Sequence, residues 1–84
     1  MDGTVRGYVT DSLGRPVTGA TVLVSGTGPV PDIAPISDEH GEFVLDGIAP
    51  GSYRCRAIGP AGEIGEISVS VETDAVTAVS IIVS

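Results

Sequence analysis

Apolar and polar residues alternate along most of this 84-residue chain. Between residues 4 and 10, for example, Val5, Gly7 and Val9 share one phase, and threonine, arginine and tyrosine residues share the other. A period of two sends successive side chains to opposite faces of an extended backbone, so this segment is predicted to be a strand with one buried face. No segment shows the 3.6-residue period of an amphipathic helix.

The same alternation marks six further short strands, which turn residues separate. These strands are predicted at residues 20–25, 36–37, 42–46, 53–58, 63–71 and 77–83. The segments between them are rich in the Gly, Pro and Asp that tight turns require. The segment 26–35 contains Pro29, Pro31 and Pro35, and because each proline removes a ladder donor we expect an exposed loop there.

Seven short strands at this spacing predict an all-β fold, a seven-stranded antiparallel Greek-key sandwich, as a single domain over residues 1–84. The inward residues are mostly Val and Ile, which suits two sheets packed about 10 Å apart. Phe43 and Tyr53 are the large core residues, and Ile48 is expected to close one end of the core. We expect Tyr53 to bond its hydroxyl to the backbone, because a buried tyrosine hydroxyl needs a partner.

The charge balance narrows the range of partners. Four basic residues against eleven acidic ones give a formal net charge of −7, which repels phosphate backbones and anionic lipid headgroups. Nucleic acid is therefore not an expected partner. No apolar run approaches the roughly 18–20 residues that span a bilayer, and the N-terminus lacks a basic region followed by an apolar stretch. We expect neither membrane insertion nor a signal peptide within this chain.

Cys55 is the single cysteine of the sequence. An internal disulfide and a multi-cysteine metal site are therefore excluded, and the redox compartment stays open. Because free cysteine usually behaves as a small core hydrophobe, we expect a buried thiol, with a reactive or partner-pairing thiol as the alternative.

Glycines, prolines and aromatic residues recur at offsets that resemble those of the carboxypeptidase regulatory-like domain. This is a transthyretin-like (prealbumin-like) sandwich related to the collagen-adhesin B-type domains. The resemblance covers nearly the whole chain. The matching residues are Gly7, Val9, Asp11, Gly14, Pro16, Gly19, Ala20, Val22, Ser37, Asp38, Gly41, Phe43, Ile48, Pro50, Gly51 and Tyr53.

The resemblance implies a non-catalytic accessory module without a cofactor, which serves as a structural spacer or a protein-interaction domain. Such domains sit beside the catalytic domain of certain metallocarboxypeptidases, in outer-membrane receptors and in tandem arrays of bacterial surface proteins. It therefore implies a larger, exported bacterial protein of the cell envelope or the extracellular space. It assigns no catalytic residue.

Three activities lack the residues that they need. The isopeptide bond that collagen-adhesin B-type domains often form requires a lysine, and this sequence has none. The hydroxyisourate hydrolases of the transthyretin-like fold carry several histidines and a characteristic C-terminal tail, whereas this chain has one histidine and ends in Ile-Ile-Val-Ser. A nucleophilic triad fails similarly, because nothing orders a serine beside that histidine.

Two groups of acidic residues are candidate metal sites. His40 lies among Asp38, Glu39 and Glu42, which suggests either a metal or acid/base site or a solvated hairpin tip. We favour the hairpin tip, because turns collect Asp and Gly for conformational reasons. Calcium held by Asp32, Asp38, Glu39 and Asp46 is the second metal hypothesis, although no EF-hand spacing supports it. No metal or catalytic residue is therefore assigned.

A partner surface is predicted on the outward phases of the strands. Arg6 and Tyr8 form the candidate carbohydrate site, because sugar sites commonly use exposed aromatic rings. Leu23, Val44, Ile58 and Ile82 also fall on outward phases, and if they cluster they form an apolar patch for a neighbouring domain. The sequence leaves the partner's identity and the oligomeric state open, since it does not separate a usable strand edge from a protected one.

Overall fold

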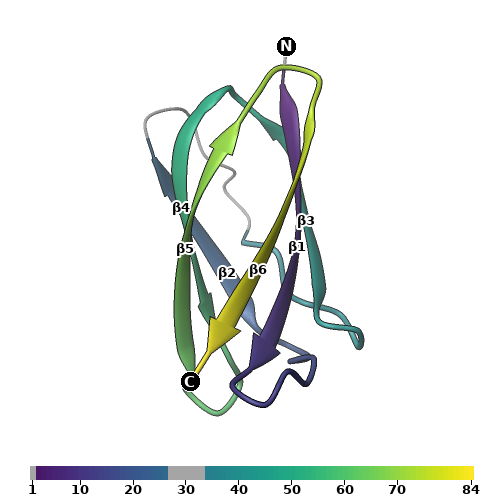
Figure 1. Ribbon diagram of the computed structural model, residues 1–84, viewed down its shortest axis with the longest axis vertical. Helices are drawn as coiled ribbons and strands as arrows, with labels where there is room; N and C mark the ends of the chain where they lie inside the picture. The colour runs from purple at the N-terminus through teal and green to yellow at the C-terminus, as the bar shows by residue number, and fades with distance from the viewer. Residues whose placement is uncertain (1, 27–33) are drawn as a thin grey trace.

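The computed structural model describes residues 2–26 and 34–84, which form six strands. The strands are β1 (Gly3–Asp11), β2 (Thr21–Gly26), β3 (Glu42–Ile48), β4 (Gly51–Ile58), β5 (Ile64–Val71) and β6 (Val76–Val83). They run along the 35 Å axis of a molecule that measures 18 Å in the two other directions (Figure 1). The described residues contain no helix of the length and apolarity that crossing a bilayer requires.

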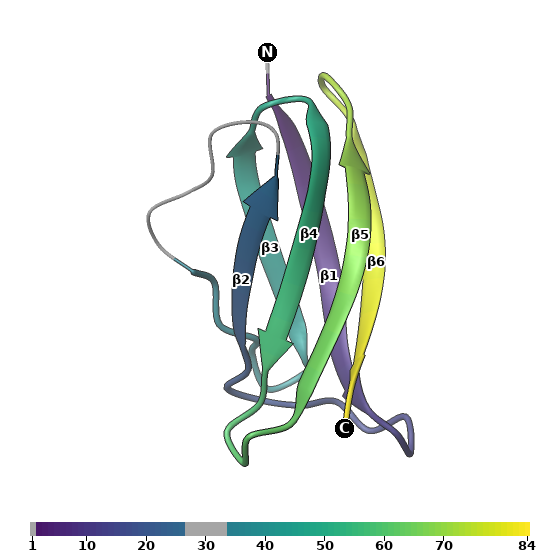
Figure 2. The ribbon, with the colours of Figure 1, turned by 90° about the vertical axis from the view of Figure 1, so that its left-hand side faces the viewer.

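Two three-stranded sheets pack face to face. Sheet I has the order β3-β1-β6 and sheet II the order β2-β4-β5, and Figure 2 shows sheet II in front of sheet I. Within sheet I, β1 is antiparallel to β3 but parallel to β6. Within sheet II, both pairings of β4 are antiparallel. The all-β sandwich expected from the alternation is confirmed.

Two details of the predicted sandwich are wrong: the described part of the chain forms six strands, not seven, and one strand pair is parallel. The strand expected at 36–37 is reduced to an isolated bridge between Thr21 and Ile36. Pro35, which precedes it, has no N–H for a ladder, and a turn follows at once. The parallel pair arises because β6 returns to sheet I beside β1, and a period of two carries no information about the neighbour's direction.

Most buried residues lie on the inward face of a strand, and Val17 and Ala20 join them from the segment between β1 and β2. Fifteen apolar residues form the core: Val5, Val9, Val17, Ala20, Val22, Phe43, Leu45, Ile48, Tyr53, Cys55, Ala57, Val69, Val71, Ile81 and Val83. The predicted burial of Phe43, Ile48 and Cys55 is confirmed, and the Tyr53 hydroxyl donates a 2.5 Å hydrogen bond to the carbonyl oxygen of Ala49. This bond satisfies a polar group that burial would otherwise leave without water.

The two long sides of the sandwich are closed differently. On one side, Ile64 and Ser84 exchange backbone hydrogen bonds of 3.2 and 3.3 Å, which tie β5 to the end of β6. On the other side, the segment at 35–37 borders β2, and the hydroxyl of Ser37 accepts the Ala20 N–H at 2.9 Å and donates to the Val17 carbonyl at 2.6 Å. Ser37 is the single buried polar residue among the described ones.

The exposed loop predicted at 26–35 lies mostly outside the described residues, because the description stops at Gly26 and resumes at Ala34. The strands on either side nevertheless keep their predicted faces. Val22 on β2 is buried before the gap, and Phe43 and Leu45 on β3 are buried after it.

Candidate functional site

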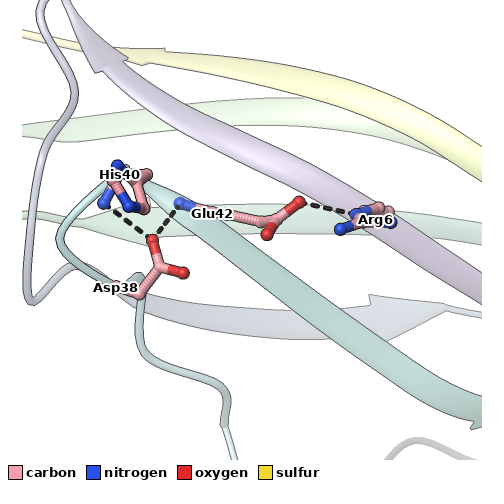
Figure 3. Close-up of polar contacts among 4 residues, drawn as sticks. All are labelled: Arg6, Asp38, His40 and Glu42. Carbon is pink, nitrogen blue, oxygen red and sulfur yellow. Dashed lines mark hydrogen bonds and ion pairs between the residues drawn. The ribbon is translucent and has the colours of Figure 1, made fainter.

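The acidic hairpin tip before β3 is organised by a single carboxylate. Oδ1 of Asp38 accepts the backbone N–H of His40 at 2.8 Å and that of Glu42 at 2.9 Å (Figure 3). These bonds hold the pKa of Asp38 below its ordinary value, because they stabilise the ionised carboxylate. The bond from Glu42 has the largest effect. The carboxylate of Asp38 thus serves the turn itself, as the hairpin-tip interpretation requires.

The loop after β1 repeats this device. Oδ1 of Asp11 accepts the backbone N–H groups of Leu13 and Arg15, each at 2.9 Å, and Oδ2 meets Nε of Arg15 at 2.9 Å. The backbone bond from Arg15 is the chief cause that lowers the pKa of Asp11. Both acidic turns therefore use their aspartate to satisfy backbone donors.

The structure does not bring the metal candidates together. Within residues 2–26 and 34–84, no three His, Cys, Asp or Glu side chains are placed to hold a metal ion. The imidazole of His40 lies 3.6 Å from Glu39, between Nε2 and Oε1, on the exposed surface. Asp38 precedes β3 and Asp46 lies near its other end, where it accepts the Thr4 hydroxyl at 2.9 Å. Asp32, the remaining calcium candidate, lies outside the described residues.

The outer face of sheet I gathers three of the four residues predicted for a partner surface. Arg6 lies opposite Val44 on β3, and Tyr8 lies opposite Glu42. Nε of Arg6 contacts Oε2 of Glu42 at 2.5 Å (Figure 3), and this bond is the main cause that lowers the pKa of Glu42. The pair neutralises both charges in the middle of the face.

An apolar stripe crosses this face diagonally and consists of Val44, Tyr8 and Ile82. The register places Val44 beside Arg6 and Ile82 beside Thr10, so both are diagonal neighbours of Tyr8 on the two flanking strands. Their exposed fractions are 45% for Val44, 43% for Tyr8 and 64% for Ile82. Three large apolar side chains therefore stand exposed along one diagonal, with Tyr8 between Val44 and Ile82.

Leu23 and Ile58 lie on the opposite side of the molecule. Leu23 on β2 is 45% exposed and is paired with Arg56 on β4. Ile58 is half-buried, with Thr21 and Ile64 as its neighbours on the two flanking strands. The four outward apolar residues therefore do not form one patch. Sequence phase gave the face of each strand correctly, but the assignment of β2 and β4 to one sheet and of β3 and β6 to the other separates Leu23 and Ile58 from the rest.

The outer face of sheet II holds a shallow depression that sequence reasoning missed. It has a volume of about 610 Å³, and its lining consists of Ser25, Gly26, Ser52, Tyr53, Arg54, Ser68, Val69 and Ser70. Arg54 lies 3.8 Å from Glu66, at the exposed surface. The sequence alternation places these serines on the outward faces of their strands. They surround one depression only because β2, β4 and β5 are neighbours in the sheet.

The fold and the surface define a small β-sandwich domain whose organised carboxylates support turns and strand pairs. The sequence profile of the carboxypeptidase regulatory-like domain matches residues 4–84, and the chain belongs to that family. The resemblance inferred from the glycine, proline and aromatic offsets is thereby confirmed. A search of curated proteins gave no match.

A solved structure with a similar fold comes from Acetivibrio cellulolyticus. It is a chain from the crystal structure of an N-terminal interface mutant of a type II cohesin–X–dockerin complex, which superimposes with a TM-score of 0.70 at 23% identity. The match covers 96% of this chain and 56% of the other. At this identity the likeness establishes the fold alone. The present chain spans little more than half the length of that structure.

Proposed function

We propose that this domain is a non-catalytic accessory module of a larger exported protein, and that it binds a neighbouring domain or another protein through the outer face of sheet I. Membership of the carboxypeptidase regulatory-like family supports an accessory role. The placement of Asp11, Asp38 and Glu42 supports a non-catalytic one, because their carboxylates are engaged by backbone N–H groups and by Arg6.

The exposed apolar stripe of Val44, Tyr8 and Ile82 carries the proposal. Single exposed apolar residues are ordinary on protein surfaces, but three diagonal neighbours on one sheet form a continuous strip. Each fully buried side chain of this kind contributes about 1.5–3 kcal/mol to association, and an aromatic residue at the centre suits a docking hot spot. The Arg6–Glu42 pair lies beside the stripe and supplies both hydrogen-bond donors and acceptors.

Thermal melts of the domain alone and joined to its neighbouring domain in the parent polypeptide test this proposal. Docking raises the melting temperature of the joined domain, because binding to the native state stabilises it. Val44→Ser is expected to reduce that increment, whereas Leu23→Ser is not. The two residues are matched, because each is 45% exposed but they lie on opposite sheets. Additive melts of the two parts, or equal effects of both variants, would contradict docking through sheet I. Fractionation of the parent protein tests export.

Carbohydrate binding is the alternative function, and the position of Tyr8 is the observation in its favour. Of the three aromatic residues, Phe43 and Tyr53 are buried. Tyr8 is exposed on β1, on the same face as Arg6 and two residues along the strand from it. A glycan panel probed with the wild-type domain and with Tyr8→Ala separates the two functions. Binding that Tyr8→Ala abolishes would establish the alternative, and a panel without signal would reject it.

A further inference from the structure

The first and last strands of this domain are neighbours that run in the same direction. The β1–β6 register is continuous over eight positions, from Thr4 opposite Val76 to Asp11 opposite Val83. Parallel neighbours necessarily begin at one end of a sheet and finish at the other, so the chain enters and leaves the sandwich at opposite ends of its 35 Å axis (Figure 1).

We propose that the β1–β6 ladder makes this domain a mechanical element that resists tension along a larger protein. Pulling on both chain ends slides β1 and β6 past each other, which loads their evenly spaced hydrogen bonds in shear and all at once. Pulling two adjacent strand ends apart opens the same bonds one after another. This inference deepens the proposed function, because it specifies what an accessory module would do as a spacer within a polypeptide under load.

The packing around β1 resists sliding in addition to the ladder itself. β1 is the central strand of sheet I, so its displacement also requires shearing the β1–β3 ladder. On the inner face, Val5 and Val9 on β1 and Ile81 and Val83 on β6 are all buried in the core. Both sliding strands are thereby anchored by side chains that cannot leave their sites without opening the core.

The absence of a side chain at Gly7 helps to fix the register of β1 against β3. The ring of Phe43 lies so close over Gly7 that a Cβ built there would come 2.4 Å from Cε1 of the ring. A slip of β1 by one residue turns its buried face to solvent. A slip by two residues toward its N-terminal end, the direction of pulling, brings Val9 with its Cβ under the same ring. Neither slip is therefore accessible without displacing Phe43.

Single-molecule force spectroscopy with two attachment geometries tests this proposal. Handles on Asp2→Cys and Ser84→Cys load the ladder in shear, and handles on Asp2→Cys and Thr73→Cys peel it. The latter two positions lie at the same end of the β1–β6 pair, where the Asp74 N–H bonds to the Asp2 carbonyl at 3.2 Å. Cys55 is fully buried, so the native domain presents only the introduced thiols.

At one loading rate, the rupture force in the shear geometry is expected to exceed that in the peeling geometry by about twofold or more, because forced unfolding reports the barrier along the loaded coordinate. Equal forces in the two geometries would overturn the proposal. Urea denaturation of both handle variants, expected to give the same midpoint, ensures that the comparison reports geometry and not stability.

A core variant and a surface variant complete the design. Phe43→Leu removes the ring that covers Gly7. It is expected to lower the rupture force in the shear geometry by a larger fraction than in the peeling geometry. An equal fractional drop in both would refute the role of the Gly7–Phe43 contact in fixing the register. Val44→Ser, which tests partner docking, is expected to leave the force ratio unchanged. The mechanical role and the docking role can therefore fail independently of each other.

Discussion

Gly7 occupies a position where a single added methyl group must displace an aromatic ring. It is buried in the middle of β1, opposite Phe43 on β3 and Val79 on β6. A Cβ at this position would lie 2.2 Å from Cζ and 2.4 Å from Cε1 of Phe43. Van der Waals contact between carbons requires about 3.5–4.0 Å, so the ring would have to move by more than 1 Å. The ring is only 2% exposed and packs within the core, so it has little room to move.

Two opposing effects set the size of the change for Gly7→Ala. Replacing glycine by alanine at a compatible backbone position stabilises a protein by about 0.4–1 kcal/mol, because the unfolded chain loses freedom. Forcing a methyl group into a filled core costs about 1–3 kcal/mol. We expect the clash to dominate, with a net loss of about 1–2 kcal/mol, which corresponds to a fall in Tm of roughly 4–15 °C for a domain of this size.

Urea denaturation of a double-mutant cycle isolates the contact. Phe43→Leu alone costs stability through the cavity that it leaves, but it also opens space for the alanine methyl group. The combined variant is therefore expected to be more stable than the sum of the two single changes predicts, by about 1 kcal/mol or more. Gly14→Ala serves as a comparison, because nothing lies within 4 Å of a Cβ there and its φ of +80° is the sole source of strain. A Gly7→Ala variant as stable as the wild type, or additive changes in the cycle, would refute the close-contact reasoning.

Three further experiments test other parts of the structure. Ser37→Ala leaves the two buried backbone groups that its hydroxyl joins without this hydrogen-bond partner. Urea denaturation is expected to show a loss of about 1–3 kcal/mol in the free energy of unfolding. An unchanged midpoint would mean that this bridge contributes nothing to stability. The pKa of Asp38 is lower in the folded than in the unfolded state, so its stabilisation is present above about pH 4 and lost as pH falls through the folded pKa. Asp38→Asn should therefore flatten the fall in stability measured by urea titrations on acidification, and parallel curves would contradict this role. Burial raises the pKa of the Cys55 thiol, so a thiol reagent is expected to modify it only on unfolding, and rapid labelling of the native domain would disprove its burial.

The sequence by itself determined which face of each strand is buried. Strand alternation is a local property, because each residue's face depends only on its position along its own strand. Phe43 and Leu45 on one strand, and Tyr53 and Cys55 on another, could therefore be assigned to the core before any partner strand was known. The same reasoning fixed the outward faces of Arg6 and Tyr8. Turn chemistry is local as well, so the roles of Asp11 and Asp38 were within reach of the sequence.

Only the tertiary structure decided which strands are neighbours. That choice placed Val44 and Tyr8 together on sheet I, moved Leu23 to sheet II, and brought the serines of β2, β4 and β5 around one depression. It also set β6 parallel to β1, with the consequences for tension proposed above. These pairings join residues far apart in the chain, and they are settled by how all the buried faces pack at once. A period of two within one strand therefore does not encode them.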